Sequence, residues 1–496
     1  MIAPLLILSG LVGGIIAGDA LGPGSARLLL ATGALVLVLA FIRRGRRVAF
    51  ALAALGACGL GIAFEQRALH GLAVSPLSAA VNGRTNGVAV LSLAEDPDGP
   101  IYASEALVRV ATFGNRDAGG RTVLAVVSGD NISALRVLDA GDRVRVRGAL
   151  EPLTGYSQRL RWRHAVARLR IEEIIAVATP SSPWYSVANT ARRAVLRGTN
   201  VLPATPRSLL GGFLLGDTRA IPDSMVNDFR AAGLSHLLAV SGANVAFALA
   251  VVDPALRRLR RGPRVAAGIG VLVLFGTMTR WEPSVLRAAV MAGLVMLARG
   301  IGRPAEARRV LVLAMIALLA SDPFLLRSVG FQLSCGACAG IVMAAAPITA
   351  RLRGPNWFRD ALGVTAAAQV GVAPVLLTTF GSVPLVALPA NLLAAPLVGP
   401  LTVWGLIASV VGGSLGPGAA SWLQLPTLTM LKVIELIAHE SAAYPLAIDG
   451  PIALMLSGLG VATLVVHRVI RRRTGRIARR GWRLLGQGQR PDPARS

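Results

Sequence analysis

The polar side chains that could act within this largely apolar sequence are concentrated between Leu215 and Val252. The stretch begins with charged residues and turns at Gly233 into an apolar run long enough to cross a bilayer. Its hydrogen-bonding side chains include Asp217, Arg219, Ser235, His236, Ser241 and Asn244. Polar groups are costly at membrane depth unless they face other helices or water. We therefore expect these side chains to face a protein interior or a polar pathway, where they would bind or pass a polar substrate.

Later apolar segments carry further isolated polar residues, and we expect both sets to line a channel. The later members are Arg287, Gln332, Ser334, Gln369 and Asn391. Ser241 and Asn244 are three apart and share a helix face. Prolines interrupt the helix of Asn391, as in the discontinuous helices that line transport sites. The alternative is that each side chain makes an interhelical hydrogen bond worth about 1 kcal/mol, but as a set they favour a polar-lined cavity.

A second group combines arginines with aromatic rings between residues 143 and 163. Its members are Arg143, Arg145, Arg147, Tyr156, Arg159, Arg161, Trp162 and Arg163. Arginines neutralise phosphates, and aromatic rings stack on bases of any sequence, so the group is typical of a surface that binds single-stranded DNA. The alternative is a solvated arginine face or a patch on the membrane surface.

The sequence predicts no catalytic residues, no cofactor and no metal site. The five histidines are isolated from one another, and the three cysteines give no disulfide framework. A Gly-Lys-Ser/Thr loop that would hold nucleotide phosphates does not occur, so a motor that supplies energy must be another chain. We therefore expect a protein that is not an enzyme.

The composition excludes an ordinary soluble protein. The chain has 496 residues, of which 54% are hydrophobic and 15% charged, and its mean hydropathy is +0.61. Folding in water could not bury so much apolar surface, so we predict a polytopic α-helical membrane protein. The net charge is +26, and the arginines cluster at the ends of apolar runs, which is typical of cytoplasmic loops. About twelve crossings with both termini in the cytoplasm satisfy this pattern.

Five segments follow from these patterns. Residues 1–70 are predicted to form three N-terminal transmembrane helices. In residues 71–180 the long apolar runs give way to short segments in which apolar and polar residues alternate, separated by turns. This pattern predicts about five strands in a small extracytoplasmic β-barrel of the OB type. Residues 181–232 read as amphipathic interfacial helices, with Arg192 on their polar side. Residues 233–470 are predicted to form the transmembrane channel, and residues 471–496 a basic cytoplasmic tail.

Several sequence blocks, in this order and spacing, resemble the ComEC family of bacterial competence proteins. They are Leu214 to Asp217, Phe229 to Gly242, Pro283 to Met291, Asp322 to Ser334 and Ala368 to Pro400. The resemblance implies a channel in the bacterial cytoplasmic (inner) membrane that admits single-stranded DNA during natural transformation. It also implies that the OB-like domain lies outside the membrane and contacts DNA.

The chain departs from the family pattern in two places. The family's usual serine-glycine-leucine-histidine run reads Ser241-Gly-Ala-Asn244, and asparagine cannot take up a proton near neutral pH. The metallo-β-lactamase-like domain of many family members has no counterpart, so a separate nuclease is expected. Other expected partners are membrane lipids, a separate DNA receptor and a motor ATPase. Two alternative functions stay open, namely a transporter of a small or lipidic anion and a membrane assembly scaffold.

Overall fold

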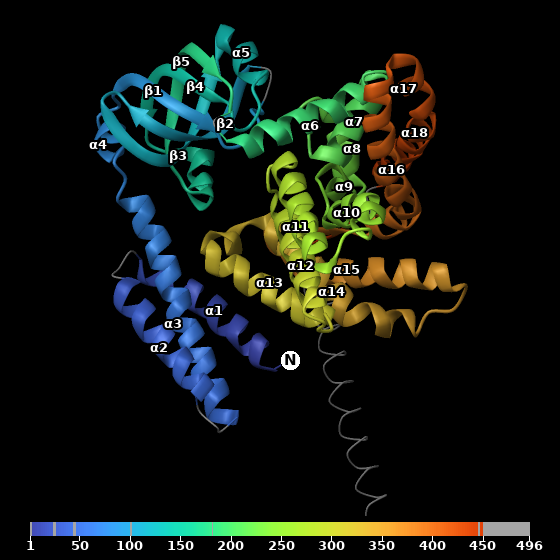
Figure 1. Ribbon diagram of the computed structural model, residues 1–496, viewed down its shortest axis with the longest axis horizontal. Coiled ribbons are helices and arrows are strands. Elements are labelled where there is room, and N and C mark those ends of the chain that lie inside the picture. Colours follow the sequence, from blue (N-terminus) through green and yellow to red (C-terminus); the bar gives the residue numbers. More distant parts are fainter. Residues whose placement is uncertain are drawn as a thin grey trace, which may run out of the picture.

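The computed structural model describes residues 2–22, 26–42, 46–99, 102–180, 182–444 and 447–449. It contains a small β-barrel, a group of three N-terminal helices below it, and a larger helical body beside both (Figure 1). Two predicted segments lie outside the described residues. They are the tail, residues 471–496, and residues 452–469, which were expected to make the last crossing.

The N-terminal helices are α1 (Ile2–Leu21), α2 (Ala26–Ile42) and α3 (Arg46–Ala73). Glycines let α1 and α3 approach closely, because a Cβ at Gly14 would lie 2.1 Å from the Cys58 carbonyl oxygen. The group docks on the helical body through Arg327, whose guanidinium lies 2.9 Å from carboxylate oxygens of both Asp19 in α1 and Glu65 in α3.

Five strands form a closed barrel in the order β1-β2-β3-β5-β4, with β4 returning to β1. All pairings are antiparallel except β3 with β5. The strands are β1 (Asn86–Leu93), β2 (Ala103–Phe113), β3 (Arg116–Ser128), β4 (Arg143–Glu151) and β5 (Ala165–Ala178). Short helices connect or precede them, namely α4 (Ser78–Asn82), η1 (Gly129–Asn131), α5 (Ile132–Arg136) and η2 (Gly155–Arg163).

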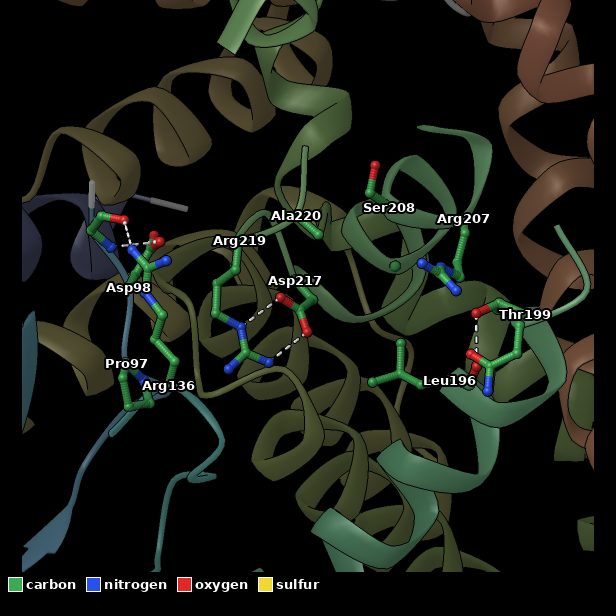
Figure 2. Close-up of a pocket in the computed structure, with 13 residues that line it drawn as sticks. Pro97, Asp98, Arg136, Leu196, Thr199, Arg207, Ser208, Asp217, Arg219 and Ala220 are labelled. Atoms are coloured by element: carbon green, nitrogen blue, oxygen red, sulfur yellow. Dashed lines mark hydrogen bonds and ion pairs between the residues drawn. The ribbon is translucent and has the colours of Figure 1, made fainter. Parts of the chain in front are cut away.

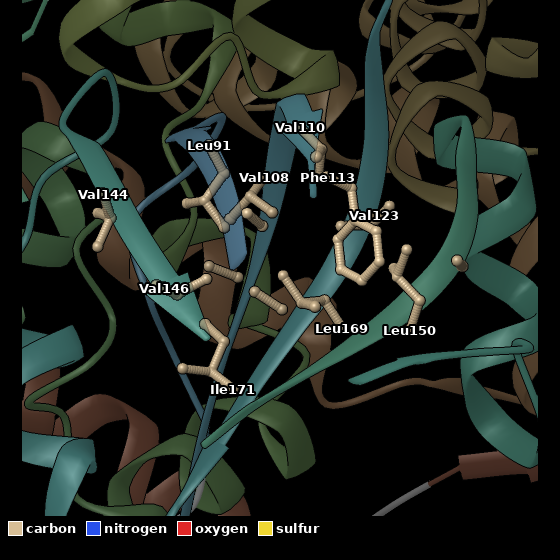
Figure 3. Packing of buried hydrophobic residues seen from close by; sticks show 14 of the residues in the cluster. Leu91, Val108, Val110, Phe113, Val123, Val144, Val146, Leu150, Leu169 and Ile171 are labelled. Carbon is tan, nitrogen blue, oxygen red and sulfur yellow. The ribbon is translucent and has the colours of Figure 1, made fainter. Parts of the chain in front are cut away.

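Period-two alternation determines which barrel residues face inward. In β4 the arginines are exposed while Val144 and Val146 are buried. These valines join Leu91, Val108 and Phe113 in an apolar core that fills the barrel (Figure 3). The prediction of about five strands in a small barrel is therefore confirmed. The turn between β2 and β3 is short, since β3 begins at Arg116.

The remaining helices form the larger body. Four helices follow the barrel in the sequence, namely α6 (Pro183–Thr199), α7 (Ala204–Leu215), α8 (Asp223–Ala231) and α9 (Ser235–Leu238). These are followed by α10 (Gly242–Leu256), α11 (Arg261–Met278), α12 (Pro283–Gly300), α13 (Ala307–Ser321), η3 (Pro323–Arg327), α14 (Val329–Thr349) and α15 (Asn356–Phe380). The last described elements are β6 (Ser382–Pro384), α16 (Ala387–Leu415), α17 (Pro417–Leu423), α18 (Leu425–Ala442) and β7 (Ala447–Asp449).

Long apolar helices make this a membrane-integral protein. Six of the described helices are long and apolar enough to cross a bilayer, and two apolar helices are shorter. Many of their large apolar side chains are exposed, as expected of surfaces that face lipid. The predicted number of about twelve crossings is not established by these helices.

Candidate functional site

The barrel meets the helical body at α6, around the buried side chain of Arg192. The sequence placed Arg192 on the polar side of a surface helix, and this prediction is wrong, because its side chain is only 2% exposed. Its Nη2 lies 3.0 Å from carboxylate oxygens of both Asp96 in the barrel and Asp217 after α7. Its Nη1 donates hydrogen bonds to the carbonyl oxygens of Leu215 and Met278. Four acceptors from three parts of the chain therefore hold this guanidinium.

The two carboxylates stay ionised because arginines surround them. Burial alone would raise the pKa of Asp96, but the charges of Arg192 and Arg280 outweigh burial and lower that pKa below its ordinary value. Burial opposes ionisation of Asp217 too, yet the bidentate contact from Arg219, at 2.7 and 2.8 Å, and the Arg192 charge lower its pKa to about 2. The network therefore keeps its charges at any physiological pH.

Arg280 adds a second link between the membrane helices and the barrel. It lies in the α11–α12 connection with φ of +58°, followed by Trp281 at +55°, a backbone conformation that non-glycine residues rarely adopt. Its Nη2 lies 2.7 Å from Asp96 Oδ1, and its Nη1 donates to Asn189 Oδ1 in α6. The Asn189 amide in turn donates to the Ala140 carbonyl of the barrel. We call Asp96, Asn189, Arg192, Asp217 and Arg280 the junction network.

A cleft of about 390 Å³ opens beside the junction network. One wall comes from the barrel, and Figure 2 shows Pro97, Asp98 and Arg136 on that side, facing α6 and α7 across the Asp217–Arg219 pair. Arg207 lines the other side. A neighbouring hollow of about 470 Å³ is lined by Arg193 and Arg197 of α6. We call these two hollows together the junction cleft. Its arginines outnumber its carboxylates, so it suits an anionic ligand.

The predicted DNA-binding arginines of β4 lie on the outer face of the barrel. Arg143, Arg145 and Arg147 alternate with buried residues and point away from the core. Arg147 pairs with Glu173 of β5 at 2.8 Å, and both side chains are more than half exposed. An exposed pair of this kind contributes little to stability and is easily exchanged for another anion.

The other predicted DNA-binding residues lie on η2, and part of this segment is covered. The Trp162 ring packs edge-on against Phe324 of η3, with ring centroids 5.3 Å apart, and the Arg327 guanidinium lies 4.1 Å from the Trp162 centroid. Arg161 lies over the same ring at 4.3 Å. Arg163 pairs with Glu95, and the Tyr156 hydroxyl donates to Glu105. Arg159 is exposed. Trp162 thus docks the barrel on the membrane domain.

Some predicted channel-lining residues are brought together. The Ser241 hydroxyl donates to Asn244 Oδ1 at 3.1 Å, and the Asn244 amide donates to the Phe213 carbonyl at 2.6 Å. Arg287 and Ser334 also meet, with Arg287 Nε donating to Ser334 Oγ at 2.8 Å. Asp217 and Arg219 line the junction cleft.

The remaining predicted channel-lining residues either donate hydrogen bonds to backbone carbonyls or are exposed. The side-chain amides of Gln332, Gln369 and Asn391 donate to nearby backbone carbonyls, namely those of Leu326, Pro384 and Ala387. Ser235 and His236 are exposed. The Asn391 bond lies within one helix, so it differs from the interhelical bonds that were the alternative, and a shared lumen lined by these side chains stays a prediction.

Glu282, in the α11–α12 connection, is a half-buried carboxyl. Burial raises its pKa to about 7, although the Val240 N–H and the Arg192 charge oppose that rise. Between about pH 4.5 and 7 the folded protein keeps a proton that the unfolded chain loses, so stability falls as pH rises through this window.

We expect Glu282→Gln to remove that fall, because glutamine stays neutral. Melting temperatures of the full chain in detergent, measured from pH 5 to 8, should decline less for the variant than for the parent. Glu306→Gln, at an exposed position before α13, is the control and should follow the parent. Parallel profiles for Glu282→Gln and the parent would contradict the prediction.

The fold and the junction define a membrane-integral protein in which a closed barrel is fixed to a helical body by buried charges. The model of the family described as Competence protein matches residues 213–471, more than half of the chain, so the chain belongs to the competence protein family.

The sequence is also similar to two curated proteins. The chain is 23% identical over 403 residues to ComE operon protein 3 of Bacillus subtilis (strain 168), which covers 79% of this chain and 49% of the relative. It is 25% identical over 236 residues to the uncharacterized protein YcaI of Escherichia coli (strain K12), covering 44% of this chain and 31% of that protein. The chain thus spans half or less of the length of these relatives. No solved structure matches.

Proposed function

We propose that this protein is a membrane channel for single-stranded DNA in natural transformation, and that the strand enters through the junction cleft. The observation that carries the proposal is the set of arginines lining a cleft where the barrel meets the membrane domain. Membership of the competence protein family supports a role in DNA uptake. A backbone that carries one negative charge per nucleotide needs such a positive entrance.

The outer face of the barrel would bind the strand before it enters. The exposed arginines of β4 supply phosphate contacts without sequence preference. A closed five-stranded barrel is consistent with the OB type, whose members bind oligonucleotides. In this proposal the barrel lies outside the cytoplasmic membrane and both termini lie in the cytoplasm. A DNA receptor and a motor ATPase would work together with this channel.

The cleft arginines provide the direct test. We expect the double variant Arg197→Gln/Arg207→Gln to bind a 20-nucleotide single strand about a hundredfold more weakly or worse, because each of the two charge-assisted contacts contributes about 1.5 kcal/mol or more. The slope of log affinity against log salt should shrink by about 1.4, as expected for two lost phosphate contacts. The measurement is fluorescence anisotropy with the full chain in nanodiscs of neutral lipid.

The control is the double variant Arg303→Gln/Arg308→Gln. It makes the same charge change at two exposed positions, one in the α12–α13 connection and one in the first turn of α13, and should bind as the parent does. Proteoliposomes under a membrane potential then test transport, since a conducting protein should protect a labelled strand from external nuclease. Absence of single-strand binding at low salt would contradict the proposal, and binding of phosphate alone would favour an anion transporter.

A further inference from the structure

Arg287 is a buried cation in a membrane helix and has no anionic partner among the described residues. It lies in the second turn of α12, one of the six candidate membrane spans, and is 6% exposed. Its Nε donates to Ser334 Oγ in α14, and its Nη1 contacts the sulfur atoms of Cys338 and Met291. All three partners are neutral. A charged side chain at membrane depth is costly and usually marks a functional site.

Arg192 is the other arginine that is buried among the described residues, and acids balance it, as they balance the less buried Arg280 and Arg327. Arg192 contacts Asp96 and Asp217, and Arg280 contacts Asp96. Arg327, at 18% exposure, contacts Asp19 and Glu65. Arg287 is therefore the exception within the part of the chain that the structure describes.

A second positive group faces Arg287. The first residue of α10 is Gly242, and a Cβ at that position would lie 2.7 Å from Arg287 Nη2. The Ser241 side chain does not cap this 15-residue helix, because its hydroxyl donates to Asn244 instead. The N-terminus of a helix carries partial positive charge and free N–H groups that bind anions. A guanidinium packed against a helix N-terminus is repelled by it, and an anion that contacts both groups would relieve this repulsion.

We propose that Arg287 and the N-terminus of α10 bind a phosphodiester of the DNA strand inside the membrane domain. The inference rests on the proposed function and adds a second phosphate site beyond the junction cleft. The two sites share their supporting elements. Asn244 of α10 is bonded to the Phe213 carbonyl of α7, and the chain after α7 supplies Asp217 and Arg219 to the cleft.

The enclosed position of Arg287 favours DNA over a lipid headgroup as the ligand. Arg287 is enclosed by α10, α12 and α14, which hides it from the lipid-facing surface. The short Ser284 to Val240 hydrogen bond, at 2.5 Å, joins α12 to the turn before α10, so both halves of the site are held together. Gly242 permits this close approach, since any side chain there would collide with the guanidinium.

A transport assay separates this site from the cleft. Arg287→Gln in full-chain proteoliposomes is expected to lower the amount of nuclease-protected strand by about tenfold or more, the effect of losing one charge-assisted contact. Affinity for external single-stranded DNA, measured in nanodiscs, should change by less than about twofold, because the cleft is intact. Arg287→Lys should restore part of the transport, since the charge remains. Arg299→Gln removes an exposed arginine from the last turn of the same helix, so it is the matched control and should retain transport.

Cys338 provides a positional readout because its sulfur contacts Arg287. In a Cys58→Ala/Cys335→Ala background, with copper phenanthroline added as the oxidant, a strand bearing a thiol-tethered phosphate should form a disulfide with Cys338, and Arg287→Gln should abolish it. Protected strand that does not depend on Arg287, or cross-linking only to a thiol-bearing phospholipid, would overturn this proposal alone. If the unaltered chain neither binds nor protects DNA, the proposed function fails as well.

The melting temperature of Arg287→Gln distinguishes a loss of transport from a loss of folding. Removal of a buried charge that lacks a counter-charge should leave the melting temperature of Arg287→Gln in detergent equal to or above that of the parent. A destabilised Arg287→Gln that still protects as much strand per folded protein as the parent would mark Arg287 as a structural residue and overturn the proposal.

Discussion

Replacement of Arg192 by alanine is expected to lower the free energy of unfolding by about 3–5 kcal/mol, the usual cost of removing one partner of a buried ion pair. The variant would leave Asp96 and Asp217 with fewer counter-charges in a site where their side chains are 10% and 13% exposed. Two backbone carbonyls would lose their donor as well. Because these acceptors belong to the barrel, to the chain after α7 and to α11, we expect the barrel to separate from the helical body.

The neighbouring residue supplies the control. Arg193 pairs with Asp139 at 2.9 Å but is 59% exposed, so Arg193→Ala should cost about 1 kcal/mol or less. Chemical unfolding of the full chain in detergent measures both variants, and limited proteolysis between β5 and α6 reports separation of the barrel. Equal losses in the two variants would show that burial of Arg192 does not matter.

Substitution of Gly198 by alanine is the second change with a large expected effect. Gly198 lies where α6 crosses α16, and a Cβ there would lie 1.9 Å from the Ser409 carbonyl oxygen. Gln424 ties the same crossing together, since its amide donates to the Gly198 carbonyl and to Ser409 Oγ, both at 3.1 Å. The obstacle is backbone, so α6 would have to move. We expect a loss of about 3 kcal/mol or more, at the upper end of overpacking effects.

Gly293→Ala is the matched control for Gly198→Ala. Gly293 also lies within a helix, but a Cβ there would meet nothing within 4 Å. Alanine at that position should leave stability unchanged or raise it by up to about 1 kcal/mol, because it favours the helix. A Gly198→Ala protein as stable as Gly293→Ala would show that α6 and α16 are not held in this close crossing.

Local patterns predicted the barrel strands but not the contacts that position the barrel. Alternation of Arg143, Val144, Arg145 and Val146 specifies one buried face whatever the strand pairs with, so β4 could be recognised. Arg192 was assigned to a polar helix face for the same kind of reason, and that assignment was wrong. Amphipathic spacing shows that a side chain needs polar surroundings, but it cannot distinguish water from carboxylates supplied by distant segments.

Two further residues show the same limit. Arg280 contacts Asp96 across 184 positions of sequence, and neither residue belongs to a recognisable motif. Trp162 has the type and spacing expected of a base-stacking ring, yet it packs on η3. Arg287 is a contrasting case, since a single arginine within an apolar segment is a sequence signal that the structure reinforces. The cost of burying a charge in a membrane does not depend on which residues lie nearby.

The docking of Trp162 on Phe324 and Arg327 has a mechanical consequence. Together with the junction network, it fixes the barrel to the membrane body at two separate places, and the connection from α3 adds a covalent one. A domain held in this way cannot pivot about a single hinge without releasing a contact. Any macromolecule lying across the arginines of β4 would therefore be presented to the membrane in one constant orientation, and its advance would depend on its own sliding rather than on a swinging barrel.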